Sequence, residues 1–233
     1  YHFVLLIACM LVDFVVGLGI SRSKKHKKLL LVVGIVFHLI CLCTFKYAGF
    51  VISELNRLSE SFNFTANIIL PIGISFYTFQ GISYLIDVYR GDIEAEESLL
   101  CYCVYISMFE QLIAGPIVTY RQVQYDLHKR NIWFEDALKG LGIFIFGLGL
   151  KVLLANPLGK LWSQTLAIGF ESVSTPLAWM GVAAYSFQLY FDFFGYSLMA
   201  IGMGRMFGFH FPQNFDHPYS AASVQLFWRR WHI

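Results

Sequence analysis

The sequence is dominated by apolar runs long enough to cross a lipid bilayer. Six such runs lie at about residues 3–20, 29–45, 68–88, 99–118, 140–158 and 177–204. A helix needs roughly 20 apolar residues to span the hydrocarbon core. Only 14% of the residues are charged, against roughly 25% in soluble domains. Backbone groups in lipid must be hydrogen-bonded within the spanning element. The runs therefore predict an all-α, multi-pass membrane protein with one domain over residues 1–233.

Composition narrows the possible ligands and partners. The net charge of +2 and the lack of an RNA- or DNA-binding motif argue against nucleic acid. The cysteines lie inside apolar runs, and those in each C-x-C pair point to different faces of a helix, so we expect no metal site. The first run lacks a basic n-region and a cleavage site, which predicts a retained helix. The absent initiator methionine, and an end one residue after His232, predict a fragment.

Basic residues in the connecting segments indicate the orientation. Segment 21–28 holds five Lys and Arg residues, which places it in the cytoplasm. If all six runs cross, seven basic residues lie in cytoplasmic segments and nine on the other side. If run 99–118 enters and leaves on the same side, thirteen lie inside and three outside. The charge distribution therefore favours the second topology, because cytoplasmic segments are enriched in Lys and Arg.

The second half of run 99–118 supports this topology. Phe109–Ile117 contains Glu110, Gly115 and Pro116. Irregular backbone is tolerated at membrane depth only where protein or water covers it. We therefore expect a re-entrant element that lines a cavity. A plain span with a proline-kinked end is the alternative.

Five ionisable residues lie inside the apolar runs: Asp13, His38, Glu110, Lys151 and Asp192. Each is costly in lipid, so each is a candidate functional residue. Asp13 and His38 can pair with each other or with backbone groups. Lys151 stands near the end of its run, where its side chain can reach the headgroups.

Asp192 belongs to a polar stripe in the last run. Tyr185, Gln188, Asp192 and Tyr196 recur at positions i, i+3, i+7 and i+11, which places them on one face of a helix. A polar stripe within a bilayer must meet another polar surface or water. It predicts either a polar contact between helices or one wall of a substrate tunnel, with Gln188 and Asp192 as substrate-binding residues.

The segment after the last run changes character. Pro212 and Pro218 prevent a regular helix across 211–218. Ser220 or Ser223 can then cap a final helix that runs for about three turns. We therefore expect an irregular connection followed by a short helix.

The end of that helix carries the strongest candidate for chemistry. Trp228 and His232 are four residues apart and would share a helical face. Neutral imidazole can take a proton from an alcohol near pH 7, and the adjacent Arg229 and Arg230 can hold an anion. His232 is therefore the predicted catalytic residue. The alternative is an aromatic and basic anchor at the membrane interface.

Three segments resemble the membrane-bound O-acyltransferase (MBOAT) family, and in particular its bacterial alginate O-acetyltransferase-like branch. LPIGISFYTFQGISYLIDVYRGD begins at residue 70, QLIAGPIVTYRQV begins at residue 111, and FDFFGYSLMAIGMGRMFGFHFPQNFDHPYSAASVQLFWRRWHI begins at residue 191. The resemblance thus runs from about residue 70 to residue 233. The combination PQNF…PY…FWRRWH is its most specific part.

The resemblance implies a ring of transmembrane helices around a tunnel, in the bacterial inner membrane and surrounded by lipid. The implied reaction moves an acetyl group from a cytoplasmic thioester, such as acetyl-CoA, toward an exported polysaccharide such as alginate. A periplasmic acetyl-transfer protein is an alternative acceptor. The expected acyl donor is a substrate, and no tightly bound cofactor is expected.

The resemblance also assigns roles to individual residues. His232 matches the first of two family histidines, and the second would follow Ile233. Arg229 or Arg230 is expected near the donor phosphates. The expected tunnel or substrate-binding residues are Gln188, Asp192, Asn214, Tyr219, Arg229, Arg230 and Trp231.

The sequence departs from the family pattern at several polar positions. Phe194 stands where serine is usual, Leu198 and Leu226 replace acids, Glu110 replaces proline, and Thr119 replaces arginine. Several of these changes remove polar groups near the expected tunnel. An inactive or substrate-divergent relative is therefore one alternative. D-alanyl transfer for teichoic acid and a non-enzymatic transporter are two others.

Overall fold

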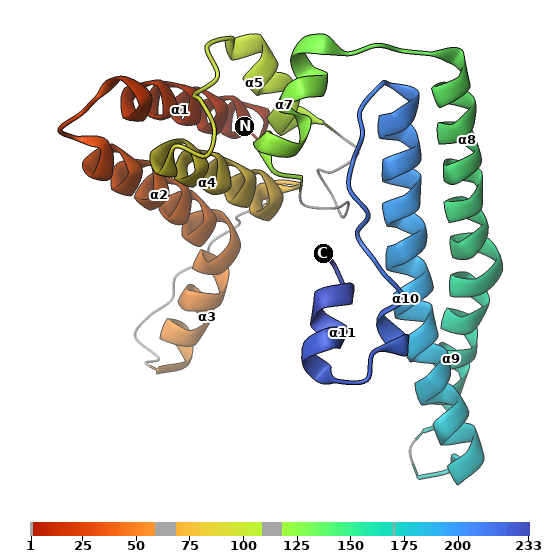
Figure 1. The fold of residues 1–233 in the computed structure, drawn as a ribbon. Coiled ribbons are helices and arrows are strands. Elements are labelled where there is room, and N and C mark those ends of the chain that lie inside the picture. Colours follow the sequence, from red (N-terminus) through yellow and green to blue (C-terminus); the bar gives the residue numbers. More distant parts are fainter. Residues whose placement is uncertain (1, 59–68, 109–117, 170) are drawn as a thin grey trace. The chain divides into compact units, whose positions relative to one another are not determined.

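The computed structural model describes residues 2–58, 69–108, 118–169 and 171–233. In these ranges the chain is helical and contains no β-strand (Figure 1). The α-helices are α1 (His2–Arg22), α2 (Lys27–Leu42), α3 (Ala48–Leu58), α4 (Ile74–Arg90), α5 (Leu99–Ser107), α7 (Tyr120–Lys129), α8 (Phe134–Gly149), α9 (Asn156–Ile168), α10 (Thr175–Met206) and α11 (Val224–Arg230). The all-α prediction is confirmed for the part of the chain that is described.

The chain forms two compact units. The first contains α1 to α5 with residues 119–124, and the second contains residues 125–233, so that α7 contributes to both. Each unit has its own packing, as described below. The assignment of residues 1–233 to one domain stays a prediction.

Three continuous helices among the described residues are long and apolar enough to cross a membrane: Phe3–Arg22, Lys27–Leu58 and Phe134–Ile168. They correspond to the first, second and fifth predicted runs. Helices α4 and α5 contain 17 and nine residues, fewer than predicted, whereas α10 covers the last run with 32 residues. The predicted re-entrant element, Phe109–Ile117, lies outside the described residues.

A π-helical turn, Leu150–Ala155, joins α8 and α9 into one helix of 35 residues. Pro157 lies in the first turn of α9, and proline has no N–H to donate and clashes with the carbonyl four residues earlier. Wider π-helical hydrogen bonding just before the proline lets the helix continue, and such turns are often found at functional sites. The π-helical turn contains Lys151.

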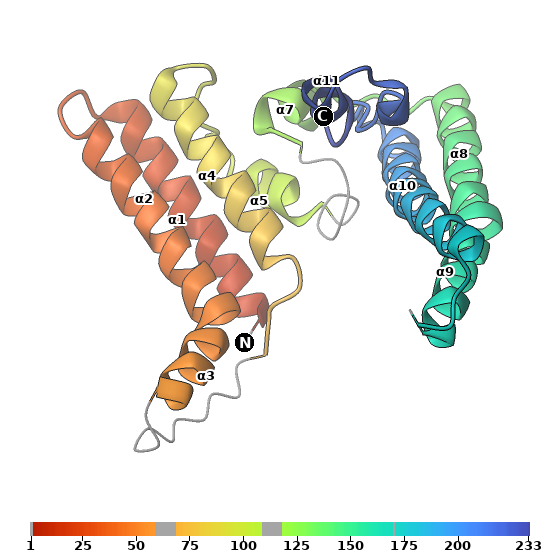
Figure 2. The same ribbon diagram turned by 90° about the horizontal axis from the view of Figure 1, so that it is seen from below.

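The first unit packs α1, α2 and α4 against one another (Figure 2). Asp13 and His38 meet in this packing, with 2.6 Å between Asp13 Oδ1 and His38 Nε2, and both side chains are buried. Gly81 of α4 faces the pair, where a Cβ would lie 2.8 Å from His38 Nε2. Of the two alternatives for Asp13 and His38, pairing with each other is the one found, and it explains how both tolerate burial.

Asp13→Ala is expected to destabilise the first unit. His38 would remain buried and lose the acceptor of its hydrogen bond, which costs about 1–3 kcal/mol. The double variant Asp13→Leu/His38→Leu removes both polar groups and is expected to recover part of that loss. The midpoint of thermal unfolding in detergent, followed by size-exclusion chromatography of heated samples, measures the effect. An equal loss in both variants would show that the pair contributes no hydrogen bond of this strength.

A buried cluster of hydroxyl and carboxyl groups closes the first unit beside α5. Glu96 accepts hydrogen bonds from the Tyr120 hydroxyl and from the Ser98 N–H, the latter at 2.7 Å. Tyr84 accepts a bond from the Glu96 N–H at 2.9 Å. Burial raises the pKa of the Tyr120 hydroxyl, so it stays protonated as a donor. These bonds tie the connection before α5 to the helices around it.

In the second unit, α8 and α10 run antiparallel and touch through glycine (Figure 1). A Cβ on Gly195 would lie 2.7 Å from the Gly147 carbonyl oxygen, and one on Gly202 would lie 2.6 Å from the Gly140 carbonyl oxygen. Because the two glycines on each helix are seven residues apart, the contacts recur every two turns along the helices. The two backbones therefore approach too closely for any side chain between them.

The chain after α10 turns back along the same helix (Figure 1). Gly208, with φ of 80°, makes the turn in a conformation that glycine adopts at little cost. The returning segment is extended and irregular up to Pro218, as the two prolines predicted. The Tyr219 hydroxyl then donates to the Ser186 carbonyl oxygen at 2.9 Å, which ties the segment to α10.

Candidate active site

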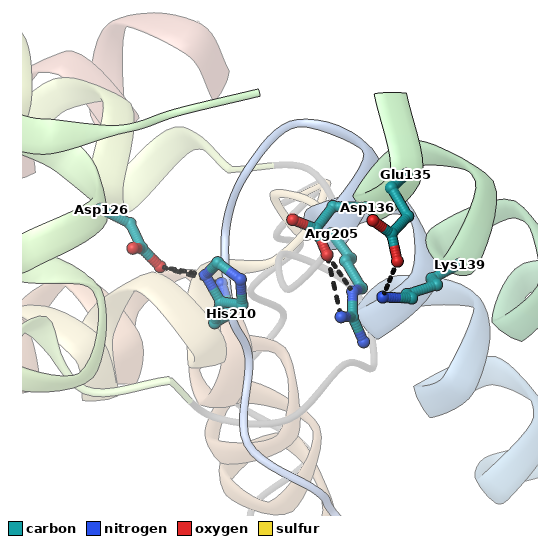
Figure 3. A network of polar contacts seen from close by, with 6 residues as sticks. All are labelled: Asp126, Glu135, Asp136, Lys139, Arg205 and His210. Carbon is teal, nitrogen blue, oxygen red and sulfur yellow. Dashed lines mark hydrogen bonds and ion pairs between the residues drawn. The ribbon is translucent and has the colours of Figure 1, made fainter. Parts of the chain in front are cut away.

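Polar contacts hold the start of the returning segment. His210 lies between Asp126 and the ion pair of Arg205 with Asp136 (Figure 3). Asp126 Oδ2 accepts from the His210 backbone N–H at 2.9 Å, and its distance to His210 Nδ1 is 3.3 Å. The His210 side chain is 61% exposed. These contacts therefore fix the position of the chain directly after α10.

Backbone hydrogen bonds join residues 214–216 to residues 230–233. The Asp216 N–H donates to the Arg230 carbonyl oxygen and the Ile233 N–H donates to the Asn214 carbonyl oxygen, both at 3.0 Å. Between them, helix α11 begins at the predicted cap, where Ser223 Oγ accepts from the Leu226 N–H at 3.1 Å. The segment thus forms a closed loop with Asn214 beside its last residues.

This closure corrects the prediction for the end of the final helix. The helix was expected to continue to His232, but α11 ends at Arg230 and Trp231 is extended. His232 has φ of 53°, a left-handed conformation that costs about 1–3 kcal/mol without glycine. Trp228 is 64% exposed and its ring meets that of Phe227, whereas the ring of His232 meets that of Phe193. Backbone pairing with residues 214–216 has replaced the last helical turn.

His232 makes a hydrogen bond to a buried amide. Its Nδ1 lies 2.7 Å from Asn214 Oδ1, and Asn214 is only 2% exposed. An amide oxygen can only accept, so Nδ1 carries the proton. The other ring nitrogen, Nε2, then has a free lone pair in the neutral ring. This arrangement leaves Nε2 as a base with a fixed orientation.

The environment of the ring keeps it neutral. Partial burial lowers the pKa of the His232 imidazole below its ordinary value of 6.5, because the charged form loses hydration. The imidazole ring also packs against Phe193 of α10, with 5.0 Å between the ring centroids. His232 is therefore available as a base at neutral pH.

Phe193 places the imidazole along α10. It lies 13 residues before Met206, the last residue of that helix, which corresponds to about 20 Å at 1.5 Å per residue. His232 is therefore beside the middle of α10 rather than beyond its end.

An aromatic cluster fixes the backbone next to His232. Trp231 stacks on Phe227 with 5.5 Å between centroids, and meets Phe215 edge-on at 5.1 Å. Tyr190 of α10 and Tyr219 contact the same indole. Such aromatic pairs each contribute about 0.5–1.5 kcal/mol beyond their buried area. Tyr219 and Trp231, two of the predicted substrate-binding residues, thus support the loop that carries the histidine.

The two arginines differ in their surroundings. Arg230 Nη1 donates to Ser220 Oγ at 2.8 Å, which closes the loop further. Arg229 is exposed and makes no hydrogen bond or ion pair within the described part of the chain. Only Arg229 is therefore free to meet an anion in this conformation.

A second set of polar side chains, apart from His232 and Asn214, lies in the second unit. Lys151 Nζ and Asp192 Oδ1 form an ion pair in which the side chains are 38% and 46% exposed. Together with Gln188 they line a cavity of about 590 Å³ between the π-helical turn, α9 and α10. The predicted common face of Gln188 and Asp192 is present in this lining. Lys151, however, lies in the middle of a 35-residue helix and not near its end.

The two polar groups occupy different faces of α10. Successive residues of a helix are 100° apart, so Phe193, which contacts His232, is turned 100° from Asp192 and 140° from Gln188. The structure brings Asn214, Tyr219, Arg230, Trp231 and His232 together on one face, and Gln188 with Asp192 on the other. Within this unit the two groups lie on separate faces of α10. The tunnel that was expected to be lined by both groups stays a prediction.

Two features of these sites were not predicted. Phe193 as the ring partner of His232 had no signal in the sequence, since many phenylalanines surround it. The pairing of Lys151 with Asp192 joins residues 41 positions apart. A search for opposite charges at similar depth in adjacent apolar runs would have found the second feature.

The family model of MBOAT, the membrane-bound O-acyltransferase family, matches residues 94–233. The match covers α5 to α11 and therefore both sites described above. It also covers the two segments of the predicted resemblance that begin at residues 111 and 191.

Curated relatives agree with this match. The chain is 41% identical to the probable alginate O-acetylase AlgI of Pseudomonas aeruginosa, over 99% of this chain and 46% of the relative. It is 35% identical to the peptidoglycan O-acetyltransferase of Helicobacter pylori, over 98% and 49%. It is 29% identical to the teichoic acid D-alanyltransferase of Bacillus subtilis, over 72% and 43%. The chain thus spans about half the length of these relatives. This chain belongs to the membrane-bound O-acyltransferase family.

Proposed function

We propose that this chain carries the histidine site of an O-acyltransferase that moves an acetyl group to the hydroxyl of an exported polysaccharide such as alginate. The observation that carries the proposal is the hydrogen bond between His232 Nδ1 and Asn214 Oδ1. It leaves Nε2 as an oriented base next to the middle of a long helix. Base catalysis by such a group contributes about 10²–10⁴ in rate.

The proposed chemistry is a transfer between a thioester and an alcohol. Nε2 takes the proton of the acceptor hydroxyl as its oxygen attacks the thioester carbonyl carbon. The new C–O bond forms, the C–S bond breaks, and the imidazolium returns the proton to the departing thiolate. Arg229, exposed beside the site, would hold the donor phosphates if the donor is acetyl-CoA. The donor is a substrate, so the proposal includes no tightly bound cofactor.

The proposed setting is the bacterial inner membrane, with lipid around the helices. Three apolar helices of spanning length support multi-pass insertion. In this setting the donor thioester is cytoplasmic and the acceptor is reached from the other side. A periplasmic acetyl-transfer protein would be an intermediate acceptor in the same scheme. The tunnel and the re-entrant element of the sequence prediction remain parts of this proposal.

Three other functional outcomes remain to be tested. D-alanyl transfer for teichoic acid is the function of a relative with lower identity than the acetyl-transferring ones. A transporter would use the polar stripe of α10 without any acyl donor. Substitutions such as Phe194 for serine would allow an inactive relative.

Reconstituted transfer distinguishes these outcomes. The full-length protein in vesicles, supplied with acetyl-CoA and a uronate polymer, is expected to release free CoA thiol and to form polymer-bound acetyl ester. D-alanyl thioester supplied in place of acetyl-CoA is expected to react more slowly. Flux of solute across the vesicle without donor, and no ester formation, would contradict the proposal.

Asn214→Ala is expected to lower kcat by about tenfold. Without the amide oxygen, the ring loses one hydrogen bond that sets its orientation and tautomer, which is worth about 1 kcal/mol or more. The KM for the acceptor is expected to change little, because Asn214 is buried behind His232. An unchanged kcat would show that Asn214 does not position the imidazole.

Asn214→Asp tests the same contact through pH dependence. Burial lowers the pKa of His232, so activity in the parent protein is lost only when pH falls below the ordinary histidine value. A carboxylate at position 214 stabilises the imidazolium and raises that pKa. The acid limb of the rate profile is therefore expected to move to higher pH. Asp216→Asn, which removes an exposed carboxylate near the loop, serves as the control and is expected to leave the limb in place.

A further inference from the structure

The connection between α7 and α8 exposes a row of apolar side chains. Ile132, Trp133 and Phe134 are 61%, 67% and 79% exposed. Phe134 begins the continuous helix Phe134–Ile168, which is long and apolar enough to cross a membrane. Tryptophan is enriched where spanning helices meet the lipid headgroups. The row therefore stands at the end of a helix where contact with lipid is expected.

Two basic residues, Lys129 and Arg130, come shortly before this row. The Arg130 guanidinium lies over the ring of Phe209, with 5.2 Å from Cζ to the ring centroid, a cation–π contact. Phe209 is only 4% exposed. A Cβ on Gly208 would lie 2.8 Å from Arg130 Cγ, so the aliphatic part of the arginine also packs on the turn after α10. The fold therefore sets the position of this guanidinium, unlike that of a surface side chain in solvent.

The acidic side chains around this connection already have partners (Figure 3). Three carboxylates occur in residues 120–139 and 205–211, and their partners are His210 for Asp126, Lys139 for Glu135 and Arg205 for Asp136. The exposed side chains of Lys129 and Arg130 form no ion pair or hydrogen bond with the residues that the structure describes. Their positive charge is therefore available to an anion from outside the chain.

We propose that an anionic phospholipid binds to the Arg130 surface, which consists of Lys129, Arg130, Ile132, Trp133 and Phe134. The lipid phosphodiester accepts two parallel hydrogen bonds from the planar guanidinium, and Lys129 adds a second positive charge. The glycerol and acyl part of the lipid contacts the apolar row. A lipid satisfies both halves of this surface, whereas a free phosphate would use only the charges. This lipid site does not depend on the acyl transfer proposed above.

Native mass spectrometry of the full-length protein in detergent tests the site. Phosphatidylglycerol and phosphatidylcholine with identical acyl chains are the probes, and the parent protein is expected to retain more phosphatidylglycerol. Arg130→Gln is expected to lower phosphatidylglycerol binding by about fivefold, the factor for one basic side chain at an anionic surface, and to leave phosphatidylcholine unchanged. Arg130→Lys keeps the charge but cannot make the planar two-bond contact, so a loss of about twofold is expected.

Lys139→Gln is the matched control for charge. It removes a cation that already pairs with Glu135 near the start of α8, and it is expected to leave phosphatidylglycerol binding unchanged. Trp133→Ala tests the apolar row and is expected to weaken both lipids by a similar factor. Equal losses in Lys139→Gln and Arg130→Gln, or equal retention of the two lipids by the parent protein, would overturn the site.

Thermal unfolding in detergent shows whether a loss of binding comes from damage to the fold. Phosphatidylglycerol is expected to raise the unfolding midpoint of the parent protein more than that of Arg130→Gln, because a ligand stabilises the folded state that binds it. An equal rise in both proteins would contradict the site. Coenzyme A, added without lipid, tests a soluble source of phosphate. If Arg130→Gln weakens coenzyme A binding and leaves phosphatidylglycerol unchanged, the surface belongs to a soluble ligand and the lipid site is wrong.

Discussion

His232→Ala is expected to reduce acetyl transfer by the full-length protein by about 100- to 10,000-fold. The variant loses the imidazole, which Asn214 and Phe193 hold beside α10. Backbone hydrogen bonds from Asp216 to Arg230 and from Ile233 to Asn214 close the loop without this side chain, so the fold is expected to persist. Release of CoA thiol and formation of acetyl ester, measured in parallel, give the rate.

The control for this variant is His217→Asn. His217 lies in the same segment, is 85% exposed, and its ring contacts Asp216. Asparagine tolerates the left-handed backbone found there, with φ of 45°. Transfer by His217→Asn is expected to match the parent protein. An active His232→Ala would remove His232 from the mechanism, and equal losses in both variants would indicate damage to the segment instead.

Alanine at both Gly195 and Gly202 is expected to destabilise the second unit by at least about 2 kcal/mol, because overpacking costs about 1–3 kcal/mol per site. The new Cβ atoms would lie 2.7 and 2.6 Å from carbonyl oxygens of α8, well inside van der Waals contact. The two helices would have to separate. Thermal unfolding in detergent is expected to show a midpoint several degrees lower.

The matched control is alanine at Gly142 and Gly149. These glycines lie on α8, the helix that α10 contacts, and also have seven-residue spacing, but a Cβ on either has no atom within 4 Å. Alanine favours helix over glycine by about 1 kcal/mol per residue, so this double variant is expected to be more stable than the parent. The two double variants thus have opposite predicted signs. A higher midpoint for the Gly195 and Gly202 variant would show that the helices do not meet as described.

Several local features could be read from the sequence because they depend on neighbours along the chain. Pro212 and Pro218 prevent helix by chemistry that is independent of the fold. Ser223 caps α11 because the helix follows it directly. The pairing of Asp13 with His38, which are 25 residues apart, was only one of the two alternatives that the sequence left open.

The end of α11 shows where such reasoning stops. The residues around Trp228 and His232 are compatible with a continued helix, and a helix was expected. Two hydrogen bonds from the backbone of Asp216 and Ile233 instead close the segment on itself. These bonds join residues 14 and 19 positions apart, so no local pattern reveals them.

The sequence by itself determined that this chain is a helical membrane protein, and it identified His232 and Asn214 as separate candidates. Only the tertiary structure decided that these two side chains touch, and that Asp192 faces Lys151 on another side of α10. The reason is physical. Burial preference and helix propensity act on each residue in its own short stretch, whereas orientation of an imidazole depends on which distant backbone and ring come to lie beside it.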